Sequence, residues 1–175
     1  MRKQTFVLFF FALLISNSIS AQNATLRNDT IYADADTPSI STKVSMEIDP
    51  SLFPNKQGSI FFCDTPRAMI MPMVIRANFD SLNQERLVAE TATELNLAIE
   101  KSGRIQKKGK DIYFISGYTK DKERSIVLEV YFIKYDLHRT IMITGFYDKV
   151  AKKKYKKQIQ RAALTATIEQ KHYQQ

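Results

Sequence analysis

Cysteine, glycine, histidine and tryptophan are scarce in this chain of 175 residues, which has one, five, two and none of them respectively. The lone Cys63 cannot close a disulfide within the chain, so the core must stabilise the fold. Cys63 lies in the apolar run 60–63, far from an N-terminal cleavage point. This position excludes the lipid-anchor cysteine of a lipoprotein and predicts burial as a small hydrophobic side chain.

Motifs for enzyme chemistry are also missing. The two histidines are His138, in a predicted turn, and His172, near the C-terminus, and neither lies beside a serine or cysteine in a nucleophile setting. The sequence contains no H-E-x-x-H, G-x-S-x-G, glycine-rich phosphate loop or paired-cysteine metal motif. We therefore predict a protein that is not an enzyme and uses no cofactor. An enzyme of unknown type, with carboxylates that meet only in space, stays open as an alternative.

The longest hydrophobic run near the N-terminus covers only residues 6–15. A membrane-spanning helix needs about 20 apolar residues, so this run is too short to span. Arg2 and Lys3 precede it, and a mostly small and polar stretch at 16–21 follows it, which is the pattern of a secretory signal. We predict cleavage between Ala21 and Gln22 and a secreted or periplasmic protein with no transmembrane span.

Acidic residues are outnumbered by basic ones. Two of the 26 Lys and Arg residues lie in the predicted signal, which leaves 24 against 18 Asp and Glu, a net charge of +6. A basic balance favours acidic proteins or anionic envelope components, and nucleic acid is not expected for an exported chain. The remaining 154 residues suffice for one domain. The predicted layout is a signal at 1–21, a flexible polar leader at 22–40, a domain at 41–170 and a tail at 171–175.

Hydrophobic periodicity predicts three strands, a helix, four strands and a second helix, an α/β (α+β) fold. The predicted strands cover residues 43–48, 59–63, 68–77, 104–107, 112–118, 125–135 and 139–146. Pro72 predicts an edge position or a bulge in the third of them. Short polar connections between the last four predict an antiparallel meander. Because strand 125–135 is largely apolar on both faces, we expect a sheet that is covered on both sides.

Two helices complete the prediction. The first covers 81–101, since Ser81 and Gln84 have capping-box spacing, an apolar stripe follows, and Gly103 is placed to end the helix. The second begins at Asp148 or Lys149 and runs to about residue 170.

This order of elements, with a starting strand at 43–48, a proline-containing turn at 51–54 and the segment 141–147 before the closing helix, resembles the PsbP-like superfamily. That superfamily is the α/β/α sandwich of the PsbP photosystem proteins, the Ran-binding Mog factor and DcrB-like bacterial envelope proteins. The resemblance covers residues 43–170 and implies an antiparallel sheet sandwiched by helices. It also implies a protein that binds a protein partner or an ion rather than an enzyme. No binding residue of the family matches a position here.

The strongest candidate site is a run of lysines at the start of the closing helix. The lysines are Lys149, Lys152, Lys153, Lys154, Lys156 and Lys157. Positive charge is unfavourable at a helix N-terminus, whereas free backbone N–H groups and ammonium groups together suit a phosphate, carboxylate or sulfate. The run therefore predicts an anion-binding or partner-binding site. A solvated face that serves only solubility is the alternative.

Two weaker candidates come from sulfur and aromatic residues. Met69, Met71 and Met73 alternate along one predicted strand, which places three thioethers on one face. Thioethers are soft ligands for Cu(I), although a methionine-lined core is the simpler interpretation. A set of tyrosines could line a groove or cover the sheet; it consists of Tyr113, Tyr118, Tyr131, Tyr135 and Tyr147.

These observations predict an exported, non-enzymatic domain that docks an acidic protein or an anionic envelope component. Peripheral contact with a membrane would be consistent with its charge. A periplasmic carrier of a soft metal or small ligand is the first alternative, and the enzyme of unknown type is the second.

Overall fold

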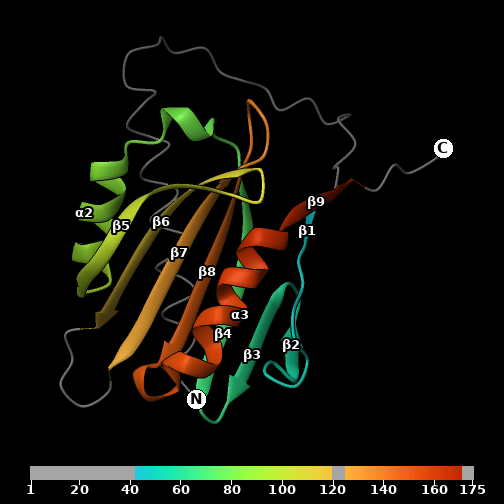
Figure 1. Cartoon of the computed structure of the whole chain (residues 1–175), viewed down its shortest axis with the longest axis vertical. Helices are drawn as coiled ribbons and strands as arrows, with labels where there is room; N and C mark the ends of the chain where they lie inside the picture. The colour runs from blue at the N-terminus through green and yellow to red at the C-terminus, as the bar shows by residue number, and fades with distance from the viewer. Residues whose placement is uncertain (1–41, 120–124, 171–175) are drawn as a thin grey trace, which may run out of the picture. The chain divides into compact units, whose positions relative to one another are not determined.

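A seven-stranded antiparallel sheet forms the centre of the domain (Figure 1). The computed structural model describes residues 42–119 and 125–170, which belong to one unit, Ile40–Gln175. In spatial order the strands are β2 (Asn55–Gln57), β3 (Ile60–Asp64), β4 (Arg67–Ile75), β8 (Thr140–Asp148), β7 (Ile126–Lys134), β6 (Lys110–Thr119) and β5 (Leu97–Lys107). Strands β5 to β8 are neighbours in chain order, so the predicted antiparallel meander is confirmed.

Helices lie on opposite faces of this sheet (Figure 1). The short 3-10 helix η2 (Lys149–Ala151) leads into α3 (Lys152–Thr165), which packs across β7 and β8. On the other face, η1 (Phe79–Ser81) approaches β7, and α2 (Gln84–Glu94) packs against β5. The seven central residues of β7 are all buried, which confirms a sheet covered on both sides and the predicted α+β fold.

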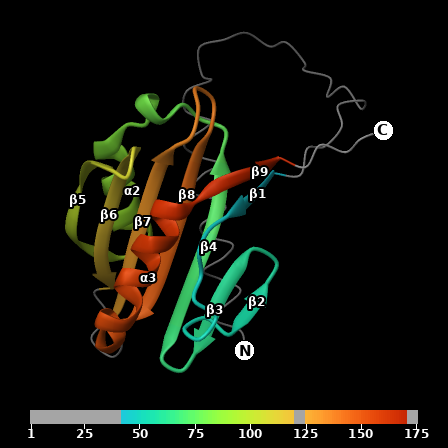
Figure 2. The same cartoon turned by 45° about the vertical axis from the view of Figure 1, so that its right-hand side comes forward.

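A separate two-stranded ribbon joins the two ends of the domain (Figure 2). β1 (Thr42–Ser45) pairs antiparallel with β9 (Thr167–Gln170), which continues from the end of α3. Val44 lies opposite Ile168 in this ribbon, and both side chains contact the main hydrophobic core. The pairing therefore fastens the beginning of the domain to its C-terminal helix.

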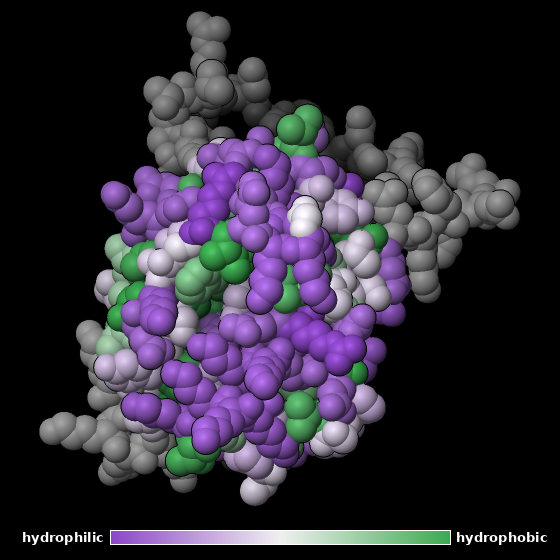
Figure 3. Space-filling view, viewed as in Figure 1, coloured by the Kyte–Doolittle hydropathy of each residue, from purple (hydrophilic) through white to green (hydrophobic). Residues whose placement is uncertain are grey.

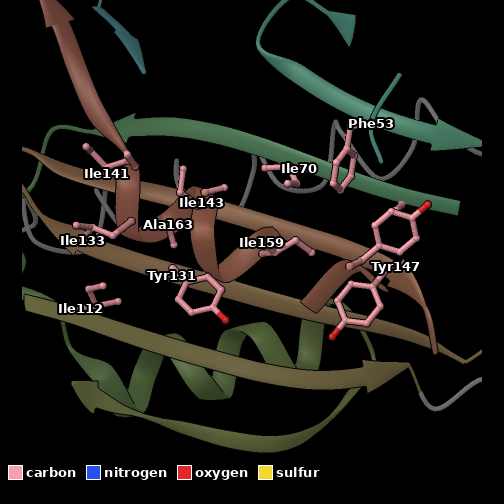
Figure 4. Close-up of a cluster of buried hydrophobic side chains, with 14 of the residues drawn as sticks. Phe53, Ile70, Ile112, Tyr131, Ile133, Ile141, Ile143, Tyr147, Ile159 and Ala163 are labelled. Atoms are coloured by element: carbon pink, nitrogen blue, oxygen red, sulfur yellow. The ribbon is translucent and has the colours of Figure 1, made fainter. Parts of the chain in front are cut away.

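The core lies between α3 and the sheet (Figure 4). Ile141 and Ile143 of β8 and Ile159 of α3 have no exposed surface, and a fully buried side chain of this kind contributes about 1.5–3 kcal/mol. Helix and sheet meet closely at Gly145, where an added Cβ atom would lie 2.5 Å from Ile159 Cδ1. A glycine at this position of β8 lets α3 approach the sheet.

The prediction for the first helix is wrong at both ends. The cap is Asn83 rather than Ser81, since its side chain accepts a hydrogen bond from the Arg86 backbone N–H at 3.0 Å. The helix stops at Glu94, and Asn96 has a φ of 48°, in the left-handed region that ends helices. Residues 97–107 instead form edge strand β5, so Gly103 lies within a strand and caps no helix.

Other boundaries also differ. The closing helix ends at Thr165, and its predicted last residues form β9, whose partner β1 lies more than 120 residues away in sequence. Strand β2 was not predicted. β3 pairs with β4 only as far as Ile70, so on that side the backbone of Pro72 has no partner strand in the main sheet, as predicted for an edge position. The alternative, a bulge, is not found, because the pairing of β4 with β8 is continuous.

Several predictions lie outside the described residues. They concern the signal at 1–21 with its cleavage site, the leader at 22–40, the tail at 171–175, and His172. None of the helices in the described part of the chain has the length and hydrophobicity that a membrane span requires.

Candidate functional site

The six predicted lysines divide into two groups. Residues three or four positions apart lie on the same side of a helix, so Lys153, Lys154 and Lys157 share one side of α3. All three are exposed, and so is Lys149 in η2. Lys152 and Lys156, one turn apart, lie on another side and are half-buried. The structure therefore brings four of the six lysines together at the surface and turns two toward the sheet.

A hydrophobic side chain lies close to the exposed group in sequence. Val150 is 94% exposed, the most exposed of the large hydrophobic residues that the structure describes, and it precedes Lys153 and Lys154 by three and four positions. We call Lys149, Lys153, Lys154, Lys157 and Val150 the lysine face. Within the described residues none of its lysines forms an ion pair, although Lys149 Nζ lies 4.9 Å from the Tyr118 ring centre. The side of the domain that carries α3 is mostly hydrophilic, with hydrophobic residues in small separate patches (Figure 3).

The other two lysines meet acids of the sheet. Lys152 Nζ lies 3.4 Å from Glu100 Oε2, and Lys156 Nζ lies 3.7 Å from Glu129 Oε1. Each of these ammonium groups has a carboxylate of the protein itself as a neighbour, so neither belongs to the exposed group.

Glu129 is the most unusual residue of the sheet. It lies in the middle of β7 on the face that α3 covers, and its side chain is 2% exposed. Its two carboxylate oxygens each accept one phenol hydrogen bond, from Tyr131 at 2.8 Å and from Tyr147 at 3.1 Å. Burial raises the pKa of both tyrosines, and the negative charge of Glu129 raises it further. Both phenols therefore stay protonated at neutral pH and remain donors to the carboxylate.

A pocket of about 120 Å³ opens beside this carboxylate. Its walls come from β5, β6, β7 and α3, and its lining residues are Glu100, Lys101, Ile105, Phe114, Ser116, Glu129, Tyr131, Lys156 and Gln160. The lining thus combines two acids and two lysines with two aromatic side chains, Phe114 and Tyr131, which are stacked with ring centres 6.5 Å apart. Such a mixture of charge and aromatic surface can bind a small polar ligand.

The methionine prediction holds as far as geometry goes. Met69, Met71 and Met73 alternate in β4 on the sheet face away from α3, and Met142 of β8 lies directly opposite Met73. Met71 is buried and the other two predicted residues are half-buried. The described residues contain no group of three His, Cys, Asp or Glu side chains that could hold a metal ion. Copper binding by the thioethers stays a prediction.

The tyrosines do not form one groove. Tyr131 and Tyr147 meet at Glu129, whereas Tyr113 lies on the opposite face, where its hydroxyl approaches the Gln84 carbonyl at 3.4 Å. Tyr118 and Tyr135 are each 37% exposed. The cluster around Glu129 was missed by sequence reasoning. Its signal was a single acid within the apolar run 126–133, on the same strand face as a tyrosine.

His138 and Cys63 also take ordinary positions. His138 is exposed in the turn between β7 and β8, where its backbone N–H donates to Asp136. Cys63 is a free, half-buried thiol that packs against the core, close to the predicted small hydrophobic role.

No protein-family model and no curated protein matches this chain. Among solved structures, the chain is similar to LpqN, involved in cell envelope biogenesis of Mycobacterium tuberculosis, with 8% identity and a TM-score of 0.49 over 77% of this chain and 87% of that one. It is similar to a putative regulator of unknown function from Pseudomonas aeruginosa, with 13% identity and a TM-score of 0.48 over 77% and 86%.

The chain is also similar to the cyanobacterial PsbP of Synechocystis sp. PCC 6803, with 9% identity and a TM-score of 0.47 over 81% of this chain and all of that one. The described residues form the arrangement predicted from the order of elements, an antiparallel sheet with a helix on each face.

Proposed function

We propose that the protein is an exported, non-enzymatic binding domain that docks through the lysine face onto an anionic surface of the cell envelope. The observation that carries this proposal is the group of four exposed lysines close to Val150 in sequence, none of them in an ion pair within the described residues. Export rests on the charged, apolar and small-residue pattern of residues 1–21.

Electrostatics favours a bound anion at this place. The four lysines belong to about two successive helical turns, so like charges are concentrated there. The first turn of α3 also contains no acidic residue to offset the positive end of the helix dipole. Each unfavourable charge there costs about 0.3–1 kcal/mol when exposed, and a nearby anion removes the cost.

Val150 favours a lipid surface over an acidic protein. An exposed hydrophobic side chain with lysines nearby in sequence suits the boundary between lipid headgroups and acyl chains, where the apolar group inserts and the ammonium groups meet phosphates. Each lysine near an anionic membrane contributes about 1 kcal/mol. Three of them therefore account for about 3 kcal/mol, or roughly a hundredfold in affinity.

Vesicle binding tests the proposal. The mature chain is expected to sediment with vesicles that contain anionic phospholipid and not with vesicles of zwitterionic lipid alone, and salt should weaken the binding. Replacing Lys153, Lys154 and Lys157 together by Gln should reduce the affinity roughly a hundredfold.

A matched control separates this face from net charge. A second variant removes the same charge elsewhere, with Lys43, Lys56 and Lys107 replaced by Gln, and it should lose much less affinity. Equal losses in both variants would show that only net charge matters. If the chain is retained on an acidic protein or on heparin but does not bind vesicles, its target is an acidic partner and not a lipid surface.

A further inference from the structure

Independently of the lysine face, we propose that the pocket between α3 and strands β5 to β7 binds a small zwitterion, a molecule with an ammonium and a carboxylate group on the same carbon atom. The proposal stands on the charge pairs of the pocket, its aromatic floor and its size. None of these features contributes to docking by the lysine face.

The inner end of the pocket holds a buried charge pair with unused hydrogen-bonding capacity. Each oxygen of Glu129 accepts one phenol hydrogen, whereas a carboxylate can accept about four hydrogen bonds in all. Lys156 Nζ lies 3.7 Å from Glu129 Oε1, which is an ion pair but too long for a hydrogen bond. Glu129 can therefore accept further hydrogen bonds from a molecule in the pocket, and Lys156 can donate them.

The rim of the pocket repeats this pairing of opposite charges. The register of β5 against β6 shifts between Ile99 and Lys101, so the bulge brings two consecutive residues, Glu100 and Lys101, to the pocket. Bulges of this kind redirect side chains, often next to binding sites. A carboxylate and an ammonium thus lie at the rim as well as at the inner end.

The floor and the volume limit what fits. Phe114 and the ring of Tyr131 form an aromatic floor, and Ile105 adds an apolar wall. A cavity of about 150 Å³ holds a benzene-sized molecule, so about 120 Å³ suits roughly six heavy atoms. Sugars and nucleotides would extend out of the pocket. A free amino acid with a minimal side chain has the right size and carries both charges.

A zwitterion also explains why the two signs of charge occur together. A simple anion would meet Glu129 and Glu100, and a simple cation would meet Lys156 and Lys101, so either one suffers repulsion from half of the charged lining. A molecule with both groups can direct its ammonium toward the acids and its carboxylate toward the lysines. Ser116 and Gln160 add polar groups to the same lining.

Backbone amide shifts in nuclear magnetic resonance test this proposal. Glycine and L-alanine are the probes, and acetate and methylamine are the corresponding half-molecules, all at constant ionic strength. We expect saturable shifts at Lys101, Ser116 and Glu129 with a Kd between about micromolar and millimolar, the range open to so few atoms. Each half-molecule should bind at least about tenfold more weakly, because one pair of charges loses its partner.

Variants connect the binding to the pocket. Lys101→Met at the exposed rim and Glu129→Gln inside should each weaken glycine binding at least about tenfold. Lys153→Met, on the outer side of α3, should leave it unchanged. If Glu129→Gln fails to fold, Lys101→Met still tests the proposal, because Lys101 is exposed. The proposal is wrong if no probe gives saturable shifts at tens of millimolar, if acetate binds as tightly as glycine, or if Lys153→Met has the same effect.

Discussion

The contact between Gly145 and α3 yields the sharpest prediction for stability. An ideal Cβ atom at Gly145 would lie 2.5, 2.6 and 2.9 Å from three side-chain atoms of Ile159. Atoms essentially never approach a Cβ so closely, and Ile159 is fully buried, so it has little room to move. Gly145→Ala should therefore overpack the core where helix and sheet meet.

The magnitude follows from a comparison with a second glycine. Overpacking a core by a methyl group typically costs about 1–3 kcal/mol. Replacing any glycine by alanine also restricts the unfolded chain, which stabilises by about 0.4–1 kcal/mol. Gly103 lies in strand β5, and a Cβ there would meet only the Phe114 ring at 3.8 Å. Gly103→Ala thus shares the unfolded-state effect without the clash, and the difference between the variants should be about 1–3 kcal/mol.

Equilibrium unfolding in urea measures this difference, provided that the slope of free energy against urea stays the same in all variants. A double-mutant cycle with Ile159→Ala adds a further check. That substitution alone should cost about 2–5 kcal/mol, but less in the Gly145→Ala background, where it removes the clash. The close approach of α3 would be refuted if Gly145→Ala and Gly103→Ala had the same free energy of unfolding. It would also be refuted if the effects of Gly145→Ala and Ile159→Ala were additive in the cycle.

Two further predictions concern a helix cap and an ion pair. Asn83→Ala removes the side chain that accepts from Arg86 N–H and should lower the free energy of unfolding by about 1 kcal/mol, while Asn83→Ser should restore most of it in the same urea experiment. Hydrogen bonds from Arg104 lower the pKa of Asp111 in the folded protein. The pair therefore stabilises the fold fully at pH values above the pKa of Asp111 in the unfolded chain, about 4. This stabilisation is lost as the pH falls through the lower pKa of Asp111 in the folded protein. The stability lost in Arg104→Gln should accordingly be largest near neutral pH and shrink below about pH 4; a loss independent of pH would contradict this.

The strands of the meander could be predicted because their evidence is local. In β6, β7 and β8, hydrophobic residues and short polar turns follow each other within a few residues, and each strand pairs with its neighbour in sequence. The first helix was placed too far along the chain for a related reason. Residues 95 and 99 have helical spacing, but the left-handed Asn96 ends the helix, and residues 97–107 pair with β6. Pairing with the sheet overrides helical spacing there.

The lysine run could be seen in the sequence, but its division into two groups could not. Lys153 and Lys156 have similar neighbours in sequence, yet one is exposed and the other meets Glu129. The rotation of α3 about its own axis decides this, and contacts such as that of Ile159 with Gly145 set the rotation.

The α+β class, the antiparallel meander and the lysine-rich start of the last helix could all be predicted from local patterns, because period-two and helical patterns act over short distances. No such pattern shows that Glu129 meets Tyr147 and Lys156, which lie 18 and 27 residues away, or that a pocket opens beside them. Strand register and helix packing bring these side chains together from distant segments, and local patterns do not encode those distances.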